Sequence, residues 1–149
     1  RWSQYVSYAF TDARYAQFQL TRVVNNTIVK TDLTNNRVEN APRHTVRTGS
    51  TLQYNAIKLT GQLSYTSGTY SDANNTRQPT ANSQNGWIPA YTVIDVTLSF
   101  PIDKSWSLSM GINNLADAVY FTRRAGGYPG PGAMPADGRT VFITLKSQL

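Results

Sequence analysis

Residues 106–113, WSLSMGIN, and residues 140–149, TVFITLKSQL, frame the last third of the chain. In both stretches apolar residues alternate with polar or small ones, and Phe142 is the one exception. Because neighbouring side chains of a β-strand point to opposite faces, each stretch predicts a strand with one apolar face. The apolar face of the second strand is predicted to hold Val141, Ile143, Leu145 and Leu149, with Gln148 on the other face.

The residues between these two strands predict a long loop. Eight glycines and prolines lie between Gly126 and Gly138, including Pro129, and they exclude a long helix or strand. The segment GGYPGPG lacks the Lys-Ser/Thr and the following helix of a phosphate-binding loop, so a plain flexible loop is favoured. Asn113 and Asn114 open the loop and are interpreted as structural, because short polar side chains bond nearby backbone where strands end.

Four further strands are predicted upstream. Residues 2–11 alternate and predict a first strand that continues through Phe18 and Leu20. Residues 44–54 and 57–65 predict a hairpin that turns at Asn55 and Ala56. Residues 91–100 predict the fourth strand, which a short turn joins to residue 106. Residues 21–42 and 71–90 read as long polar loops, and the first could hold a short hairpin around VVNNTIV.

The lengths of the connections discriminate between architectures. They run long, two residues, long, about five residues and long, so all the long connections fall at one end of the strands. Outer-membrane barrels have short periplasmic turns and long extracellular loops, whereas a soluble sandwich has no reason for this arrangement. Aromatic residues also gather in two girdles, as barrels show. Those near the short turns are Trp2, Tyr54, Phe100 and Trp106, and those near the long loops are Tyr65, Tyr70, Trp87, Tyr91 and Tyr120.

Composition is compatible with such a barrel. No apolar run approaches the ~18 residues of a transmembrane helix, and barrel strands escape hydropathy scans, so the mean hydropathy of -0.41 does not argue against a membrane. The absence of cysteine excludes disulfides and thiolate metal sites. The net charge of +6 comes from dispersed residues, with no Lys/Arg run longer than two, so nucleic acid is not expected as a partner.

The order NNLAD, VYF, a Gly/Pro-rich stretch and DGRTVFITL resembles the C-terminal end of TonB-dependent outer-membrane receptors. Upstream, APRHTVRTGSTLQY, SYTSGTYSDANNT and GWIPAYTVIDVTLSF follow the order of the same family, so the resemblance covers nearly the whole chain. The branch it resembles most is that of ferric-siderophore and ferric-citrate receptors. One departure is Leu149, since barrels of this family usually end in an aromatic residue. The insertion signal is therefore degenerate, or the true C-terminus lies further on.

The resemblance implies an all-β fold, an antiparallel transmembrane β-barrel of the twenty-two-stranded type, of which residues 1–149 would be about the last six strands. The start at Arg1, without a signal peptide, also predicts a fragment. The expected location is the bacterial outer membrane. The implied partners are the rest of the barrel with its plug domain, the TonB complex, a ferric chelate, and the lipid bilayer with its lipopolysaccharide. The plug and the segment that contacts TonB are expected to be absent from this chain.

Catalysis finds little support in the sequence. GxSxG, HExxH and CxxC are absent, and the single histidine, His44, is interpreted as a strand-start residue. The carboxylates are spread without metal-ligand spacing, and Asp72 and Asp117 are expected to shape turns. The sequence therefore predicts neither an enzyme, a cofactor nor a metal site.

Arginines near the predicted loops are the candidate ligand-binding residues. The planar guanidinium donates two parallel hydrogen bonds to a carboxylate or phosphate and stays charged at any working pH. Neighbouring tyrosines add aromatic surface. The alternative interpretation is that the arginines bind lipopolysaccharide phosphates or keep the loops solvated. The candidates are Arg123, Arg124, Tyr120, Tyr128, Arg77 and Arg47.

Three functional hypotheses remain open. The first is a TonB-dependent receptor that imports a scarce chelate, either ferric siderophore or ferric citrate, with cobalamin or a glycan as other ligands. The second is a soluble β-sandwich module that binds carbohydrate, and the third is an outer-membrane barrel enzyme. The barrel predicts that Leu52, Leu63, Val96, Leu108 and Ile143 face lipid. It predicts that Thr51, Gln62, Asp95, Ser109 and Thr144 face the lumen.

Overall fold

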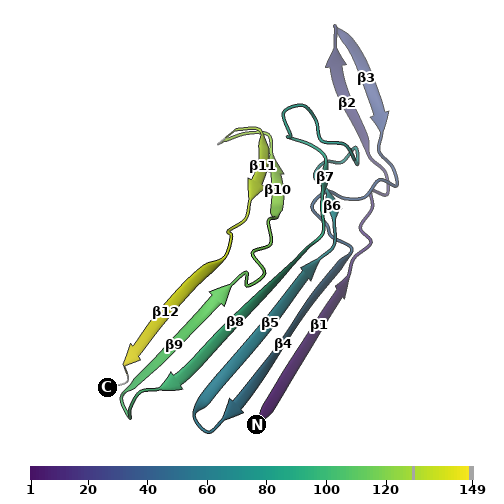
Figure 1. Cartoon of the computed structure of the whole chain (residues 1–149). Helices are drawn as coiled ribbons and strands as arrows, with labels where there is room; N and C mark the ends of the chain where they lie inside the picture. The colour runs from purple at the N-terminus through teal and green to yellow at the C-terminus, as the bar shows by residue number, and fades with distance from the viewer. Residues whose placement is uncertain (129, 148–149) are drawn as a thin grey trace.

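The computed structural model describes residues 1–128 and 130–147, and every regular element in them is a β-strand. Six strands form one antiparallel sheet in the order β1-β4-β5-β8-β9-β12, and they lie side by side in Figure 1. Their bounds are β1 Trp2–Phe10, β4 His44–Tyr54, β5 Ile57–Thr66, β8 Tyr91–Pro101, β9 Trp106–Asn113 and β12 Thr140–Ser147. The all-β, antiparallel prediction is confirmed. Pro129, Gln148 and Leu149, which the sequence assigned to a loop and to the last strand, lie outside the described residues.

The register of the sheet fixes which residues share a face, because directly opposite residues point the same way. One continuous apolar row crosses five strands through Leu52, Leu59, Leu98, Met110 and Ile143. We call this side the apolar face and the other the polar face. As predicted, Leu52, Leu63, Val96, Leu108 and Ile143 share the apolar face. Thr51, Gln62, Asp95, Ser109 and Thr144 share the polar face.

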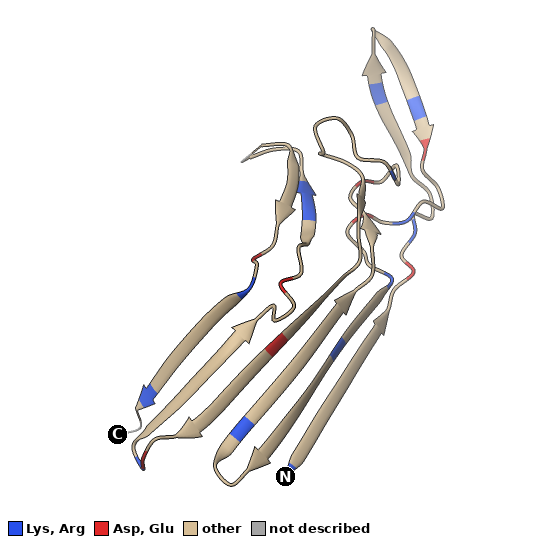
Figure 2. Cartoon of the chain, in the orientation of Figure 1, with Lys and Arg blue, Asp and Glu red and all other residues tan. Residues whose placement is uncertain are grey.

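The charged side chains of the sheet all lie on one side. Those of the six long strands, in the described residues, are Arg47, Lys58, Asp95 and Lys146, and the register puts all four on the polar face. Figure 2 shows how sparse charge is along these strands. Hydroxyl groups fill much of the remaining polar face and bond across strands, as in the pairs Thr51 with Thr60 (3.0 Å) and Ser99 with Ser109 (2.9 Å).

The sheet is a single layer, and nothing in the described residues packs on either of its faces as a second sheet would. Val141 and Ile143 are each 70% exposed on the apolar face. The buried hydrophobic residues of the described chain, Leu33, Ile88 and Ala125, all lie in the connections. A sandwich buries the inner faces of two sheets against each other, so the sandwich hypothesis is not favoured. β1 and β12 each have a neighbour on one side only.

Phe142, the exception to the alternation, has a packing explanation. It lies opposite Gly111 on the polar face, and a Cβ added to Gly111 would lie 2.5 Å from Phe142 Cζ and 2.8 Å from the carbonyl oxygen of Val96. The ring therefore occupies the space above the glycine. Tyr5 covers Gly49 across β1 and β4 in the same way. Aromatic side chains placed over strand glycines restore packing that glycine alone lacks.

The connections alternate as predicted, and Figure 1 shows the three long ones together at one end of the sheet and the two short turns at the other. We call these the loop end and the turn end. The turn between β4 and β5 is Asn55 and Ala56, with Asn55 at a positive φ of 52°. Short hairpins lie inside the long connections: β2 Gln19–Val24 with β3 Thr27–Asp32, β6 Thr69–Tyr70 with β7 Trp87–Ile88, and β10 Phe121–Ala125 with β11 Gly132–Pro135.

Three features of these connections differ from the sequence predictions. Residues 71–90 are not all loop, since β7 lies among them and pairs with β6. The first strand does not continue through Phe18 and Leu20, because the chain leaves the sheet after Phe10: Leu20 belongs to β2, while Phe18 stacks on Tyr15 with ring centroids 4.7 Å apart. The third connection is not a plain loop, since β10 and β11 pair within it. The hairpin around VVNNTIV is confirmed, with both turn asparagines at positive φ, as tight hairpin turns favour.

No helix among the described residues is both long and apolar enough to cross a membrane.

Candidate functional site

The loop end holds five of the six candidate ligand residues. It consists of a first loop (residues 11–43), a second loop (residues 67–90) and a third loop (residues 114–139). Figure 2 shows their basic residues on separate hairpins above the sheet. Loops supported by a rigid sheet are common places for binding residues.

Asn114 anchors the start of the third loop. It is 3% exposed and has a positive φ of 51°. Its backbone N–H donates to Asp95 Oδ1 (2.8 Å), its Oδ1 accepts from the N–H of Ala118 (2.8 Å), and its Nδ2 donates to the carbonyl of Ala118 (2.9 Å). Asp117 closes the loop by accepting from the N–H of Arg139 at 3.0 Å. The structural interpretation of Asn114 and the turn-shaping role of Asp117 are confirmed.

Tyr120 stands at the rim between the third loop and β8. Its ring stacks on that of Tyr91, with centroids 4.5 Å apart and planes 24° from parallel. Partial burial raises the pKa of Tyr120, and Tyr91, Asp95 and Asp137 add to the shift. Tyr120 is therefore a neutral phenol at working pH and offers a donor and an aromatic surface at the rim.

Arg124 is held by the second loop. Its NH1 donates to the carbonyl of Ser83 (2.9 Å), its NH2 donates to the carbonyl of Trp87 (3.2 Å), and its guanidinium lies 4.9 Å from the ring centroid of Phe121. Nε is buried and has no hydrogen-bond partner among the described residues. The sequence grouped Arg124 with Arg123 on position alone. In the structure Arg124 bonds the second loop, whereas the side chain of Arg123 is exposed.

The other candidates are exposed and dispersed. Arg123 on β10, Arg77 in the second loop and Tyr128 at the tip of the third loop all face solvent, Tyr128 with 98% of its surface. Arg47 lies on the polar face of β4 between Ser7 and Ser64. Within residues 1–128 and 130–147, the side chains of Arg47, Arg77 and Arg123 make no hydrogen bond or ion pair. The structure therefore does not join the six candidates into one cluster.

The first loop neutralises part of its own charge. Asp12 pairs with Arg14 (3.4 Å) and Arg43 (3.3 Å), and Tyr15 donates a short hydrogen bond to Glu39. This bond raises the pKa of Tyr15 to about 12, with burial and the charge of Glu39 adding to the shift. Thr34 bonds the carboxylate of Asp32 and lowers its pKa.

Sequence reasoning missed the residues that join the loops. Asn75 accepts from the N–H of Arg37 and donates to its carbonyl, each at 2.8 Å, although the two residues lie on different loops. The one local signal was the Asn-Asn-Thr run, since asparagine tolerates the positive φ of 56° that residue 75 adopts. Asp72 accepts from the N–H and the hydroxyl of Thr76, which confirms its turn-shaping role.

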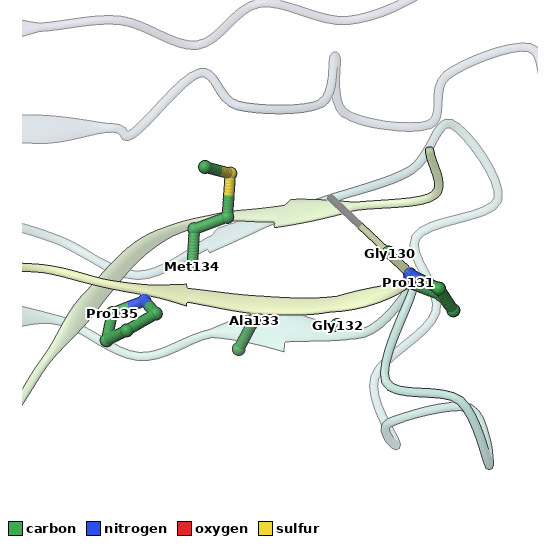
Figure 3. A pocket seen from close by; sticks show the side chains of 6 residues that line it. All are labelled: Gly130, Pro131, Gly132, Ala133, Met134 and Pro135. Atoms are coloured by element: carbon green, nitrogen blue, oxygen red, sulfur yellow. The ribbon is translucent and has the colours of Figure 1, made fainter. Parts of the chain in front are cut away.

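The tip of the third loop carries a shallow hollow of about 340 Å³ lined by Gly130, Pro131, Gly132, Ala133, Met134 and Pro135. Figure 3 shows Met134 and Ala133 extending to opposite sides of β11. No lining residue is charged, so the hollow offers shape and apolar contact but no anion site. In the part of the chain that the structure describes, no group of three or more His, Cys, Asp or Glu residues could hold a metal ion.

Comparison with known proteins gives one family. The family model "TonB dependent receptor-like, beta-barrel" matches residues 1–115. A curated protein of Acinetobacter baumannii, "Probable TonB-dependent siderophore receptor PiuA", is 29% identical over 82 residues, which cover 55% of this chain and 9% of that protein. The chain thus spans a small part of the relative that it matches.

Solved structures share the fold. The unliganded ferric citrate transporter FecA superposes with a TM-score of 0.77 at 19% identity, over 98% of this chain and 20% of that one. PiuA from A. baumannii gives 0.77 at 22% identity, over 99% and 20% of the chains. The ferric yersiniabactin uptake receptor FyuA from Yersinia pestis gives 0.68 at 18%, over 99% and 21%.

The six-stranded sheet accordingly corresponds to part of a larger barrel, with the apolar and polar faces as its two sides. The matched proteins are receptors and transporters by name, and the expectation that the chain is not an enzyme is confirmed. With most of its residues covered by the family model and nearly all of them by the shared fold, the chain belongs to the family of TonB-dependent receptor-like β-barrels.

Proposed function

We propose that the protein containing this chain is an outer-membrane receptor that takes up a scarce ferric chelate, either a ferric siderophore or ferric citrate, with energy delivered through TonB. The single observation that carries the proposal is the one-sided sheet. Among the described residues of the six long strands, its apolar face has no charge and its polar face has all four charged side chains, and three long loops lie at one end. A barrel wall between lipid and an aqueous lumen needs this distribution.

The strand lengths support the same placement. The six strands have 8 to 11 residues, close to the roughly 9–11 residues that a tilted strand needs to span the hydrocarbon core. In the proposed orientation the apolar face contacts lipid, the loop end is extracellular and the turn end is periplasmic. The free edges of β1 and β12 pair with the rest of the barrel, and a plug domain outside this chain fills the lumen and contacts TonB.

The ligand class rests on the loop chemistry and on the relatives. Siderophore and ferric citrate receptors are among the proteins that share the family or fold. Arg123 and Arg77 are exposed and offer charge to an anionic chelate, while Tyr128 and Tyr120 offer aromatic surface. Arg47 lies on the polar face, where it meets a ligand that passes into the lumen. The contacts of Arg124 support a different role, that of joining two loops.

The test is uptake by cells. Iron-starved Gram-negative cells that lack their own chelate receptors would express the full-length protein and receive radioactive iron as ferric citrate, a ferric catecholate or a ferric hydroxamate. We expect uptake of one class, dependent on TonB, with the protein recovered in the outer-membrane fraction. Uptake that persists without TonB would indicate a passive pore, and no uptake of any chelate would contradict the ligand class. Cobalamin and oligosaccharides serve as the comparison ligands.

A further inference from the structure

Arg124 joins two loops that are distant in sequence. Its two terminal nitrogens donate to carbonyls at two points of the second loop, Ser83 at 2.9 Å and Trp87 at 3.2 Å. A planar guanidinium can bond two acceptors in one plane, whereas an ammonium group is a point charge without that fork. The contact therefore uses the shape of the arginine as well as its charge.

The packing around Arg124 brings the same two loops together. Ala125, the next residue, is 8% exposed, and Ile88 in the second loop is 2% exposed. A Cβ added to Gly126 would lie 3.1 Å from Gln84 Cγ and closer still to the amide of that side chain. The third loop thus passes directly against the side chain of Gln84 in the second loop, which would have to move to admit a side chain at residue 126.

The second loop is in turn bound to the first. Asn75 makes both backbone hydrogen bonds to Arg37, Asn36 Nδ2 donates to the carbonyl of Ala73 (3.0 Å), and the N–H of Asn40 donates to the carbonyl of Tyr70 (2.8 Å). The three loops therefore form one chain of contacts with the second loop in the middle. Arg124 supplies the side-chain bonds on one side of it, and Asn75 and Asn36 supply them on the other.

We propose that Arg124 is a positioning residue, which fixes the third loop on the second so that the exposed groups of all three loops present one ligand-binding surface. The inference rests on the proposed function. Its neighbour Arg123 is exposed and makes no such contact, so the two arginines act differently: Arg123 through its charge, and Arg124 through the arrangement of the loops.

The size of the effect follows from the population of the aligned arrangement. When only a fraction of molecules holds the binding-competent arrangement, the apparent dissociation constant rises by the inverse of that fraction. If the loss of the two Arg124 bonds leaves roughly one molecule in ten in the aligned arrangement, the apparent affinity falls about 10-fold.

The first arm of the test keeps the positive charge at residue 124 and removes the two-pronged hydrogen bonding of the guanidinium. Arg124→Lys and the matched control Arg123→Lys would be made in the full-length receptor, and binding of ferric citrate or a ferric catecholate, whichever the unsubstituted receptor takes up, would be measured at low and high salt. We expect Arg124→Lys to lose about 10-fold in affinity at both salt concentrations and Arg123→Lys to bind as the unsubstituted receptor does. Full affinity of Arg124→Lys would overturn the proposal.

The second arm restores the link without the arginine. Gln84→Cys and Gly126→Cys replace residues in direct contact, and together with Arg124→Ala they would join the loops by a disulfide. Oxidation should restore the affinity lost in Arg124→Ala, and a reductant should remove it again. A receptor that stays weak when the disulfide is verified by mass spectrometry would overturn the positioning role, because a direct ligand contact cannot be replaced in this way.

A failure of the proposed function gives a separate result. If the unsubstituted receptor binds none of the chelates, the ligand class is wrong, and amide hydrogen exchange at residues 80–88 then tests Arg124 by itself. Faster exchange in Arg124→Lys than in Arg123→Lys would support the link, and equal exchange in the two variants would overturn it.

Discussion

Leu63 and Gln62 are neighbours near the middle of β5 and point to opposite faces. Leu63 lies opposite Thr48 and Ile94 on the apolar face, which carries no charged residue among the described strand positions. Gln62 lies opposite Asp95 on the polar face. Replacing each by arginine therefore compares the same side chain, one residue apart, in the two proposed environments.

The expected difference is large. An arginine on the lipid face of a barrel near the midplane costs about 2–4 kcal/mol, which lowers the folding equilibrium constant roughly 30- to 700-fold at 1.4 kcal/mol per factor of ten. Gln62→Arg should cost little, because the new guanidinium stays in the lumen and has the carboxylate of Asp95 on the adjacent strand. Leu63→Arg should thus be the destabilising member of the pair.

The assay is unfolding of the full-length receptor from phosphatidylcholine vesicles in guanidinium chloride, followed by tryptophan fluorescence. We expect the midpoint of Leu63→Arg to fall clearly below that of Gln62→Arg, with the latter close to the unsubstituted protein. Equal midpoints, or a lower midpoint for Gln62→Arg, would refute the assignment of the two faces.

Four shorter predictions follow from the same geometry. Gly111→Ala should destabilise the folded protein by about 1–3 kcal/mol by overpacking, whereas Gly61→Ala, with no atom within 4 Å of the new Cβ, should be nearly neutral; comparable unfolding midpoints would contradict this. Asn114→Ala removes the side-chain bonds to Ala118 and should cost about 1–3 kcal/mol, to be measured in the same unfolding assay, where an unchanged midpoint would count against the anchor. Arg123→Ala should weaken binding of an anionic chelate more at low salt than at high salt; binding that is independent of salt would return this side chain to a solubility or lipopolysaccharide role. Residues 1–149 alone should aggregate in buffer without detergent, because the apolar face and both sheet edges lack partners; a monomer with cooperative thermal unfolding would argue the opposite.

Period-two alternation explains why the sheet could be predicted. Side-chain direction in a strand depends on local backbone geometry alone. The strand from Trp106 to Asn113 could therefore be predicted from its own eight residues, and the structure has the same bounds. The exception at Phe142 was visible but could not be explained, because its partner Gly111 is identified only once the register of β9 and β12 is known.

The loop end was harder to predict for a physical reason. Phe18 and Leu20 continue an alternating pattern, yet hydrogen bonds to residues some 15 positions away, such as that from the N–H of Leu33 to the carbonyl of Phe18, take the chain out of the sheet. The two bonds of Arg124 cross about 40 residues. Such contacts depend on how separate loops pack against one another above the sheet, and no local sequence pattern predicts this packing.

The paired hydroxyls of the polar face have a consequence for how that face can bind a neighbour. Thr51 bonds Thr60 and Ser99 bonds Ser109, so in each pair one hydroxyl donor is already used within the sheet itself. A neighbour that moves along such a surface leaves fewer donors and acceptors without a partner. A buried polar group is costly chiefly when its own partner is lost. In the proposed barrel, a plug domain would therefore be held against this part of the sheet more by shape than by hydrogen bonds.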